Sequence, residues 1–203
     1  MSLLSASSAA LVLLTLLPAP VQKPGEARHP TAPETFRAHA NATNKDGAAA
    51  ATYVDIQIDK YTRDADRDKL TQALKSGGYP ALLTAVRNAP AVGTVTIGKD
   101  TFTIRFAREQ RTGENKRKIA VVTDKPMYFV GGGHVNAKPR EGYELAALQF
   151  DMDDAGTGQG TMAAAARIKP DGTGGFIIDD YADQPIKLVS ISRSLTPVKE
   201  GKR

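Results

Sequence analysis

Alternation of apolar and polar residues is the feature that most restricts how this chain can fold. In TYVDIQIDKY, residues 52–61, every second residue from Val54 to Ile58 is aliphatic, and the residues between them are polar. A period of two sends successive side chains to opposite faces of a β-strand. The run therefore predicts a half-buried strand with Val54, Ile56 and Ile58 facing a core.

Similar short runs continue from Val92 to Ser194. VGTVTIG and TFTIRFA flank a sequence typical of a tight turn, and in the second run Phe102, Ile104 and Phe106 fall on one face of a strand. Further strands are predicted by ETFRAHANAT near the N-terminus and by KIAVVTD, YELAALQFDM, GTMAAAARI, GFIIDDY and PIKLVSIS.

Residues 63–89 interrupt the β pattern. Leu70, Ala73 and Leu74 fall at helical spacing, and Gly77-Gly78 is a common helix terminus. Pro80 then suits the first turn of a second short helix. We expect a helical hairpin over residues 63–89.

Together these patterns predict a mainly β protein, α+β by content. An antiparallel barrel or sandwich of about eight or nine strands accounts for the order of the runs, with the helical hairpin covering one face or one open end. An open α+β sheet is the alternative. A chain of 203 residues suits one domain, which we place at residues 34–194.

The first 22 residues carry no charged side chain and include the apolar run Ala9–Leu17. This run is shorter than the ~20 residues that span a bilayer, and it resembles the hydrophobic region of a secretory signal peptide. We expect a signal peptide over residues 1–22, a proline-rich linker over 23–33 and a frayed basic tail over 195–203. The mature chain would be periplasmic or extracellular, without a transmembrane segment. A disordered apolar N-terminus is the alternative.

The composition excludes several kinds of site. The chain has no cysteine, which excludes thiol catalysis, cysteine-based zinc sites and disulfides. Three histidines are too few for a histidine-rich metal site, and 6% aromatic residues without tryptophan argue against a sugar-binding platform. No serine-nucleophile or phosphate-loop motif occurs. We expect no cofactor, and the sequence favours a non-enzymatic protein without deciding the matter.

The acidic segment DMDDAGTGQG, residues 151–160, resembles the start of a calcium loop, with Asp151 and Asp153 as candidate metal ligands. Ala155 and Met162 stand where an EF-hand loop has two further ligands, and strand-like runs flank the segment. A turn between two strands explains the same aspartates and glycines. We therefore favour a hairpin turn over a calcium site.

The segment RFAREQRTGENKRK is strongly basic, in a chain whose net charge is +5. A hairpin here would project its positive side chains from one end of the fold and bind a polyanion, such as anionic lipid or envelope glycan. A solvated edge hairpin is the alternative, because Lys and Arg protect sheet edges from aggregation. No nucleic-acid-binding motif accompanies the segment, and we expect no nucleic acid partner. The candidate residues are Arg105, Arg108, Arg111, Lys116, Arg117 and Lys118.

Three functions remain open. The leading hypothesis is a non-enzymatic binding or envelope-associated domain whose interior holds a small apolar ligand. The second is a hydrolase that uses His134 or carboxylates such as Asp151, Asp153 and Asp179, and the third is the polyanion-binding module. The sequence leaves the oligomeric state undetermined. The residues expected to line an apolar site, which equally suit a packed core, are Val54, Ile56, Ile58, Phe102, Ile104, Phe106 and His134.

The runs VDIQIDKYTRDADRDKLTQALKSGG, VVTDKPMYF and GYELAALQFDMDDAGTGQGTMAAAARIKPDG resemble a group of uncharacterised exported bacterial proteins. The resemblance covers roughly residues 34–193. It implies a bacterial, exported origin, and it assigns no activity and no catalytic residues to this chain.

Overall fold

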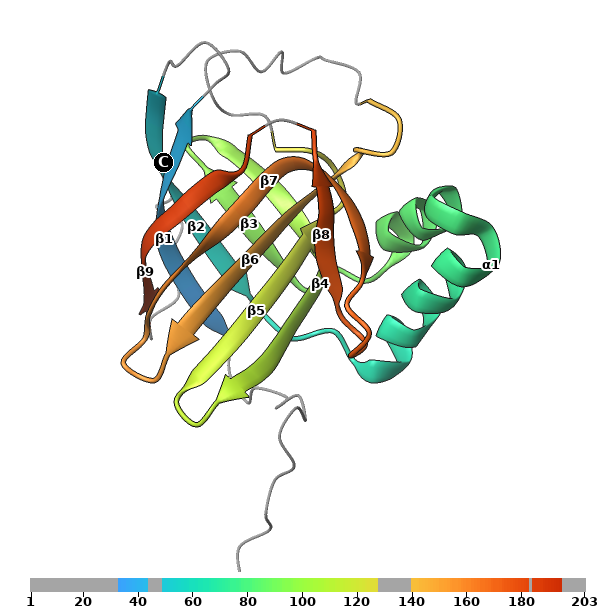
Figure 1. Ribbon diagram of the computed structural model, residues 1–203, viewed down its shortest axis with the longest axis horizontal. Coiled ribbons are helices and arrows are strands. Elements are labelled where there is room, and N and C mark those ends of the chain that lie inside the picture. The colour runs from blue at the N-terminus through green and yellow to red at the C-terminus, as the bar shows by residue number, and fades with distance from the viewer. Residues whose placement is uncertain (1–32, 44–48, 128–139, 183, 195–203) are drawn as a thin grey trace, which may run out of the picture.

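The computed structural model describes residues 33–43, 49–127, 140–182 and 184–194. The expected signal peptide and tail, residues 23–32 of the expected linker, and His134 lie outside these residues. Within them the chain forms one helix and nine strands (Figure 1). The elements are β1 (Glu34–Thr43), β2 (Ala49–Ile58), α1 (Asp64–Asn88), β3 (Gly93–Ile97), β4 (Asp100–Gly113), β5 (Lys116–Thr123), β6 (Leu145–Asp153), β7 (Thr157–Pro170), β8 (Phe176–Tyr181) and β9 (Ile186–Ser194).

Eight of the strands close into an antiparallel barrel. The hydrogen-bonded neighbours follow the order β6-β5-β4-β3-β2-β1-β9-β7, and a further pairing of β6 with β7 joins the two ends. This arrangement confirms the predicted mainly β fold. Of the arrangements considered from the sequence, the fold is the barrel rather than the sandwich or the open sheet.

The ninth strand, β8, lies outside the closed barrel. Residues 157–162 of β7 pair with β9, whereas Ala166–Pro170 pair with β8. β8 therefore pairs with the end of β7 that β9 leaves free, on the same edge of β7. Figure 1 shows β8 and the loop before it on the side of the barrel that faces α1, away from β9.

The inside of the barrel holds an apolar core to which all eight strands contribute. The rings of Phe36 and Phe150 pack edge to face, with their centroids 5.2 Å apart. Val54, Ile56 and Ile58 are at most 1% exposed, as the alternation predicted. Burial of each such side chain stabilises the fold by about 1.5–3 kcal/mol.

The predicted helical hairpin is the kinked helix α1, which covers part of the outer wall. The backbone leaves helical geometry at Gly78, where φ is +66°, and Pro80 follows at the start of the second half. Leu70 from the first half and Leu82 and Val86 from the second are buried in a second apolar core. No helix within the described residues has the length and apolar character needed to cross a bilayer.

The wall side of this second core is a row of outward-facing residues. Phe106, Val122, Ala147 and Ala163 lie next to one another on β4, β5, β6 and β7. Phe176, on β8, meets Phe106 edge to face, with 5.1 Å between ring centroids. The barrel wall from β4 to β7 is therefore buried on both sides in this region.

A β-bulge in β4 places Phe106 outside the barrel. The register with β5 shifts between Ile104 and Phe106. Ile104 and Ala107 both face the interior, and two residues lie between them where a regular strand has one. Thr62 holds the bulge: the Ala107 N–H donates to Thr62 Oγ1 at 3.0 Å, and the Thr62 N–H donates to the Ala107 carbonyl at 2.8 Å. The common face expected for Phe102, Ile104 and Phe106 therefore ends at Ile104, because the extra residue reverses the alternation.

At Gly160, in β7, the neighbouring strand β6 leaves no room for a side chain. A Cβ atom there would lie 2.6 Å from the Cα of Phe150 and would also collide with the carbonyl oxygen of Gln149. Both are backbone atoms, which a change of rotamer cannot move. Because β6 and β7 are the pair that joins the two ends of the sheet, this contact constrains the closure itself.

Gly160→Ala should lower the free energy of unfolding by about 1–3 kcal/mol, because the added methyl group forces β6 and β7 apart. Urea denaturation followed by circular dichroism measures the change. Gly113→Ala is the matched control, since a Cβ there would lie 3.8 Å from the Cβ of Lys116, an ordinary contact. Equal stabilities for the two variants would contradict the close approach.

Candidate functional site

The bulge in β4 divides the basic segment into an inward and an outward set. Ala107, just past the bulge, faces the interior, so the even-numbered residues that follow face outward. Arg108 is paired with Ala120 of β5, and Gln110 with Lys118. The six basic residues identified in the sequence consequently do not form one surface.

Arg117 points into the barrel, where it forms an ion-pair network. Its guanidinium donates to the Glu34 carboxylate at 2.8 and 3.0 Å and to the Glu109 carboxylate at 3.2 Å. The Tyr61 hydroxyl donates to Glu34 at 2.7 Å, and Arg193 donates to it at 3.3 Å. Only 14% of the Arg117 side chain is exposed, so this arginine serves the fold rather than a polyanion.

The two carboxylates of this network differ in how readily they ionise. Burial opposes ionisation of Glu34, but hydrogen bonds from Arg117 and Tyr61 outweigh it and hold the pKa of Glu34 below its ordinary value. Burial raises the pKa of Glu109 above its ordinary value, although Arg117 acts in the opposite direction. The network therefore favours a negative charge at Glu34 more than at Glu109.

Two further arginines of the basic segment have structural contacts. Arg105 forms an ion pair with Asp124 at 3.2 Å and donates to the carbonyl oxygen of Ala89 at 2.8 Å, which ties β4 to the end of α1. Arg111 donates to the carbonyl oxygen of Glu114 at 3.4 Å within the β4–β5 hairpin. The members of the segment that face outward or are exposed are therefore Arg108, Lys116 and Lys118.

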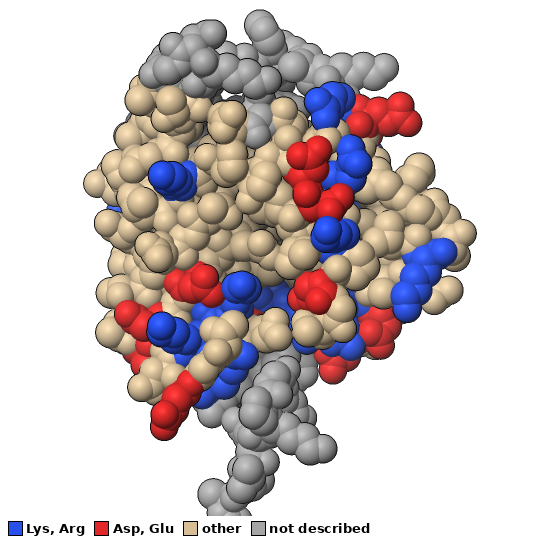
Figure 2. Space-filling view, viewed as in Figure 1, with Lys and Arg blue, Asp and Glu red and all other residues tan. Residues whose placement is uncertain are grey.

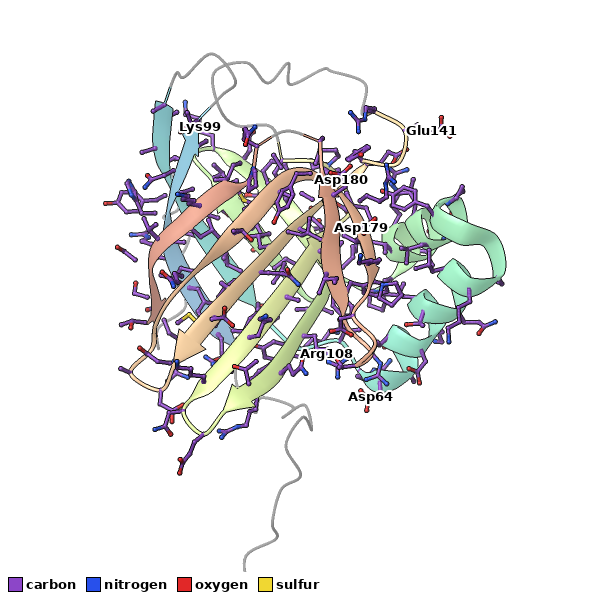
Figure 3. The ribbon with its side chains drawn as sticks, in the orientation of Figure 1. Asp64, Lys99, Arg108, Glu141, Asp179 and Asp180 are labelled. Carbon is purple, nitrogen blue, oxygen red and sulfur yellow. The ribbon has the colours of Figure 1, made fainter. Side chains whose placement is uncertain are left out.

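Arg108 and Lys118 line a pocket on the outer wall of the barrel. The pocket has a volume of about 140 Å³ and lies between the wall and the loop that joins β7 to β8. Figure 3 shows Arg108 beside the lower end of β8 and the beginning of α1. The wall contributes Arg108, Gln110, Lys118, Ala120 and Gln149, and the loop and β8 contribute Asp171, Thr173, Gly175, Phe176 and Ile177.

Arg108 lines this pocket, and two of its hydrogen-bond donors beneath the β7–β8 loop are unused. Its Nε and Nη1 atoms are buried and have no hydrogen-bond partner among the described residues. Burial, and then the positive charge of Arg67, hold the pKa of Arg108 below its ordinary value, yet a guanidinium stays charged at neutral pH. A buried donor without a partner costs about 1–3 kcal/mol, and more when it is charged. An anion that reached these donors by displacing the β7–β8 loop would remove that cost.

Glycine at position 174 lets the β7–β8 loop approach two guanidinium groups. A Cβ there would lie 2.9 Å from Nη1 of Arg108 and 2.9 Å from Nε of Arg67, and φ is +87°. Arg67 is ion-paired with Asp64 and with Asp68, each at 2.9 Å. Of the two guanidinium groups, Arg108 is the one without an ion pair within the described part of the chain.

Asp171 shapes the loop and adds a carboxylate to the pocket lining. Its Oδ1 accepts hydrogen bonds from the N–H groups of Thr173 and Gly175, both at 2.8 Å. Burial opposes ionisation of Asp171, but these bonds prevail and hold its pKa below the ordinary value. One negative charge against those of Arg108 and Lys118 leaves the lining net positive, which suits a ligand with one anionic group.

The surface charge agrees with this local assignment. Figure 2 shows positive side chains gathered over the lower part of the barrel, across β4 and β5 and toward the beginning of α1, with acidic side chains among them. The surface over β9 and the adjoining part of β7 is largely uncharged in the same view. On the same face further positive side chains lie higher up, on the side of β8, where acidic side chains separate them, so the positive charge forms no continuous track.

The acidic segment forms the turn between β6 and β7, in agreement with the favoured interpretation. The Asp153 carboxylate accepts from the N–H of Thr157 at 2.8 Å and from its hydroxyl at 2.7 Å, and these bonds hold the pKa of Asp153 below its ordinary value. Asp151 is paired with Lys118 in the register of β5 and β6. Among the described residues, no three His, Asp or Glu side chains come together as a metal-binding group.

The carboxylates on β8 belong to contacts away from the pocket. Asp179 is ion-paired with Lys169 at 2.8 Å. Asp180 accepts a hydrogen bond from the Tyr143 hydroxyl, to which Arg167 donates at 2.9 Å. Figure 3 shows both aspartates on the upper part of β8, separate from Arg108. These side chains act as partners in ion pairs and hydrogen bonds.

The side chains expected to line an apolar site are core residues. Five of the candidates face the interior, are at most 6% exposed and pack within the interior core. Phe106 belongs to the second core, on the outer side of the wall. The five interior residues are Val54, Ile56, Ile58, Phe102 and Ile104.

The sequence pointed to Arg108 and Lys118 but not to the other half of the pocket. The loop PDGTGG, residues 170–175, is typical of an ordinary turn, and Gln149 of a polar position in a strand. The three glycines in this loop were a signal, because glycine often marks backbone that approaches another group closely. What they approach depends on the position of β8, which local patterns do not specify.

No family model, curated protein or solved structure matches this chain. The resemblance to exported bacterial proteins therefore remains a prediction.

Glu109→Gln should raise the free energy of unfolding at about pH 7, and the gain should vanish near pH 4. The pKa of Glu109 is higher in the folded state than in the unfolded state, because burial disfavours the charged carboxylate. Below the unfolded pKa the side chain is protonated in both states and burial carries no charge penalty. As pH rises through the folded pKa, the buried carboxylate ionises and the protein loses stability. Glutamine keeps an oxygen for Arg117 without the buried charge. Urea denaturation at the two pH values measures the difference.

Glu34→Gln should change the free energy of unfolding at neutral pH in the opposite direction. The pKa of Glu34 is lowered in the folded state, so its ionised form stabilises the protein above the unfolded pKa, and this contribution is lost as pH falls through the folded pKa. This variant should therefore be less stable than the parent at neutral pH. A change of the same sign for both variants would contradict the charge distribution described here.

Proposed function

We propose that this chain is a non-enzymatic binding domain that holds one anionic group of its ligand in the pocket under the β7–β8 loop. Arg108 carries the proposal, since its buried Nε and Nη1 donors have no hydrogen-bond partner among the described residues. Guanidinium donors bind carboxylate and phosphate oxygens, often in pairs. Lys118 brings a second positive charge to the same pocket.

The dimensions of the pocket support a single anionic group over a polymer. A volume of about 140 Å³ accommodates a phosphate or carboxylate with a few attached atoms. Arg117 and Arg105 are engaged with carboxylates of the fold, which removes them from any extended track. The proposal therefore combines the binding domain expected from the sequence with a narrower version of the anion-binding alternative.

The chemistry of the lining supports binding over catalysis. Asp171 is hydrogen-bonded to the loop backbone and its pKa is lowered, which makes it a poor proton donor or acceptor near neutral pH. The ten lining residues include no histidine and no serine. The one hydroxyl in this set, that of Thr173, is hydrogen-bonded to the Asp171 carboxylate, whose lowered pKa makes it a weak base for activating a nucleophile.

The apolar stretch within residues 1–22 supports export, and we propose that the domain acts outside the cytoplasm. Two sources of a suitable group exist there, the phosphate of a lipid headgroup and the carboxylate of a sugar acid. Both offer the oxygen geometry that Arg108 can bind through two donors.

Titration of the ¹⁵N-labelled protein with inorganic phosphate, and separately with glucuronate, tests the proposal by NMR. We expect saturable shifts at the amides of Gly174, Gly175 and Ile177 and at the Arg108 Nε–H. Arg108→Met should weaken the affinity by about tenfold or more, because a hydrogen bond to a charged group contributes about 1.5–3 kcal/mol. Tighter binding of phosphate would favour a headgroup, and tighter binding of glucuronate a sugar acid.

Arg63→Met is the matched control, because it removes the same charge from an exposed arginine close to the beginning of α1. It should leave the affinity unchanged. An equal loss of affinity in both variants would mean that binding depends only on the net charge of the protein. Shifts that persist in Arg108→Met would place binding elsewhere, and either result would overturn the proposal.

A further inference from the structure

One edge of β2 is open. β3 pairs with β2 only from Val54 to Ile58, so no described strand pairs with residues 49–53 on that side, while β1 pairs with them on the other. Figure 1 shows the ends of β1 and β2 projecting at the upper left, and Figure 3 labels Lys99, of the β3–β4 turn, close to them in the view. An open edge presents backbone N–H and C=O groups to any strand that approaches it.

The strand residues of this open edge carry no charged side chain, and Lys99, near it in Figure 3, belongs to the adjoining β3–β4 turn. Residues 49–53 read AAATY, and the outward-facing Ala49, Ala51 and Tyr53 are exposed. Tyr53 is 62% exposed and is the one large apolar side chain with such exposure in the described part of the chain. Proteins commonly protect strand edges with lysine or other charged residues, and none stands among these five residues.

We propose that two copies of this chain associate through this edge, with β2 antiparallel to β2 about a two-fold axis at Ala51. Ala51 then faces Ala51 of the second copy, and Tyr53 faces Ala49 of the second copy. The same strand supplies both sides of the contact, as in other two-fold interfaces. The sheet continues from one barrel to the other through the two β1–β2 hairpins.

The absence of charge on the edge favours a second copy as the occupant. When a strand pairs with itself about a two-fold axis, a charge on the residue at the axis, here position 51, would face its own copy, and like charges in opposing positions destabilise the pair. Residues 49–53 avoid this repulsion. Asp55, the next outward-facing residue of β2, is already ion-paired with Arg37 at 2.6 Å.

The side chains are also complementary in size in this register. The Tyr53 ring lies against His39, with ring centroids 5.4 Å apart, and the Arg37 guanidinium is 5.8 Å from its centroid. The ring is thus held in place within one copy, which reduces the entropy lost on association. Alanine at position 49 of the second copy leaves space for it.

The contact is short, and this limits its strength. Stable interfaces bury about 1,200–2,000 Å², more than one pair of short strands provides. We therefore expect a weak dimer whose population rises with protein concentration. The strands that line the Arg108 pocket do not include β2, so each copy keeps its pocket.

A single cysteine tests the register directly, because the chain has none. Ala51→Cys places two sulfur atoms across the axis at a Cα–Cα distance of about 4.5–5.5 Å, which a disulfide spans. Mild oxidation should yield about tenfold more cross-linked dimer than Asn41→Cys gives. Asn41 is the matched control, since it is exposed and pairs with Ala51 on β1, one strand farther from the axis.

A second variant tests the association without cross-linking. Ala51→Lys should abolish the rise in mean mass with concentration in sedimentation experiments, because two lysines would face each other, and circular dichroism should show an unchanged fold. Ala51→Cys without cross-linking, equal cross-linking in Asn41→Cys, or association unaffected by Ala51→Lys would each overturn the proposal. A monomer whose edge instead captures an extended peptide would overturn it as well.

Discussion

The two edges of β7 organise the rest of the molecule. A strand has one row of hydrogen-bonding groups on each edge, and β6 occupies one of these edges. The other edge is divided, because β9 takes residues 157–162 and β8 takes Ala166–Pro170. The pairing with β9 connects β7 to β1 and so closes the barrel. The second keeps β8 outside, where its apolar side chains and those of α1 form the second core on the wall.

The bulge in β4 then determines which chemistry lies on which side of the wall. One extra residue reverses the alternation, so that Phe106 faces the second core and Arg108 faces the pocket, while Glu109 meets Arg117 inside. Within the described residues the interior consists of an apolar core and a compact set of ion pairs around Arg117. Along the outer side of β4, the character changes within a few residues from a buried ring at Phe106 to an amide at Gln110.

Local patterns in the sequence predicted the parts of the structure that depend on local geometry. The alternation around Ile56 and the glycines and proline within residues 63–89 predicted a β-rich fold with a kinked helical segment. Closure by β6 and β7 and the outer position of β8 could not be predicted, because pairing between distant strands leaves no periodic signal. The bulge lies inside the alternating run TFTIRFA, so Phe106 was assigned to the wrong face. Charge alone also failed to separate Arg117 from Arg108, since the Glu34 partner of Arg117 lies 83 residues away in the chain.

The position of β8 has a consequence for how such a domain diversifies. The loop at residues 170–175 belongs to a hairpin whose hydrogen bonds are not those that close the barrel. Insertions, deletions and exchanges in that loop therefore leave the hydrogen bonds that close the barrel in place. Under the function proposed above, a change of ligand preference would need changes in one hairpin alone, with the barrel left as it is. The barrel and its outer β7–β8 hairpin can, in this sense, vary separately.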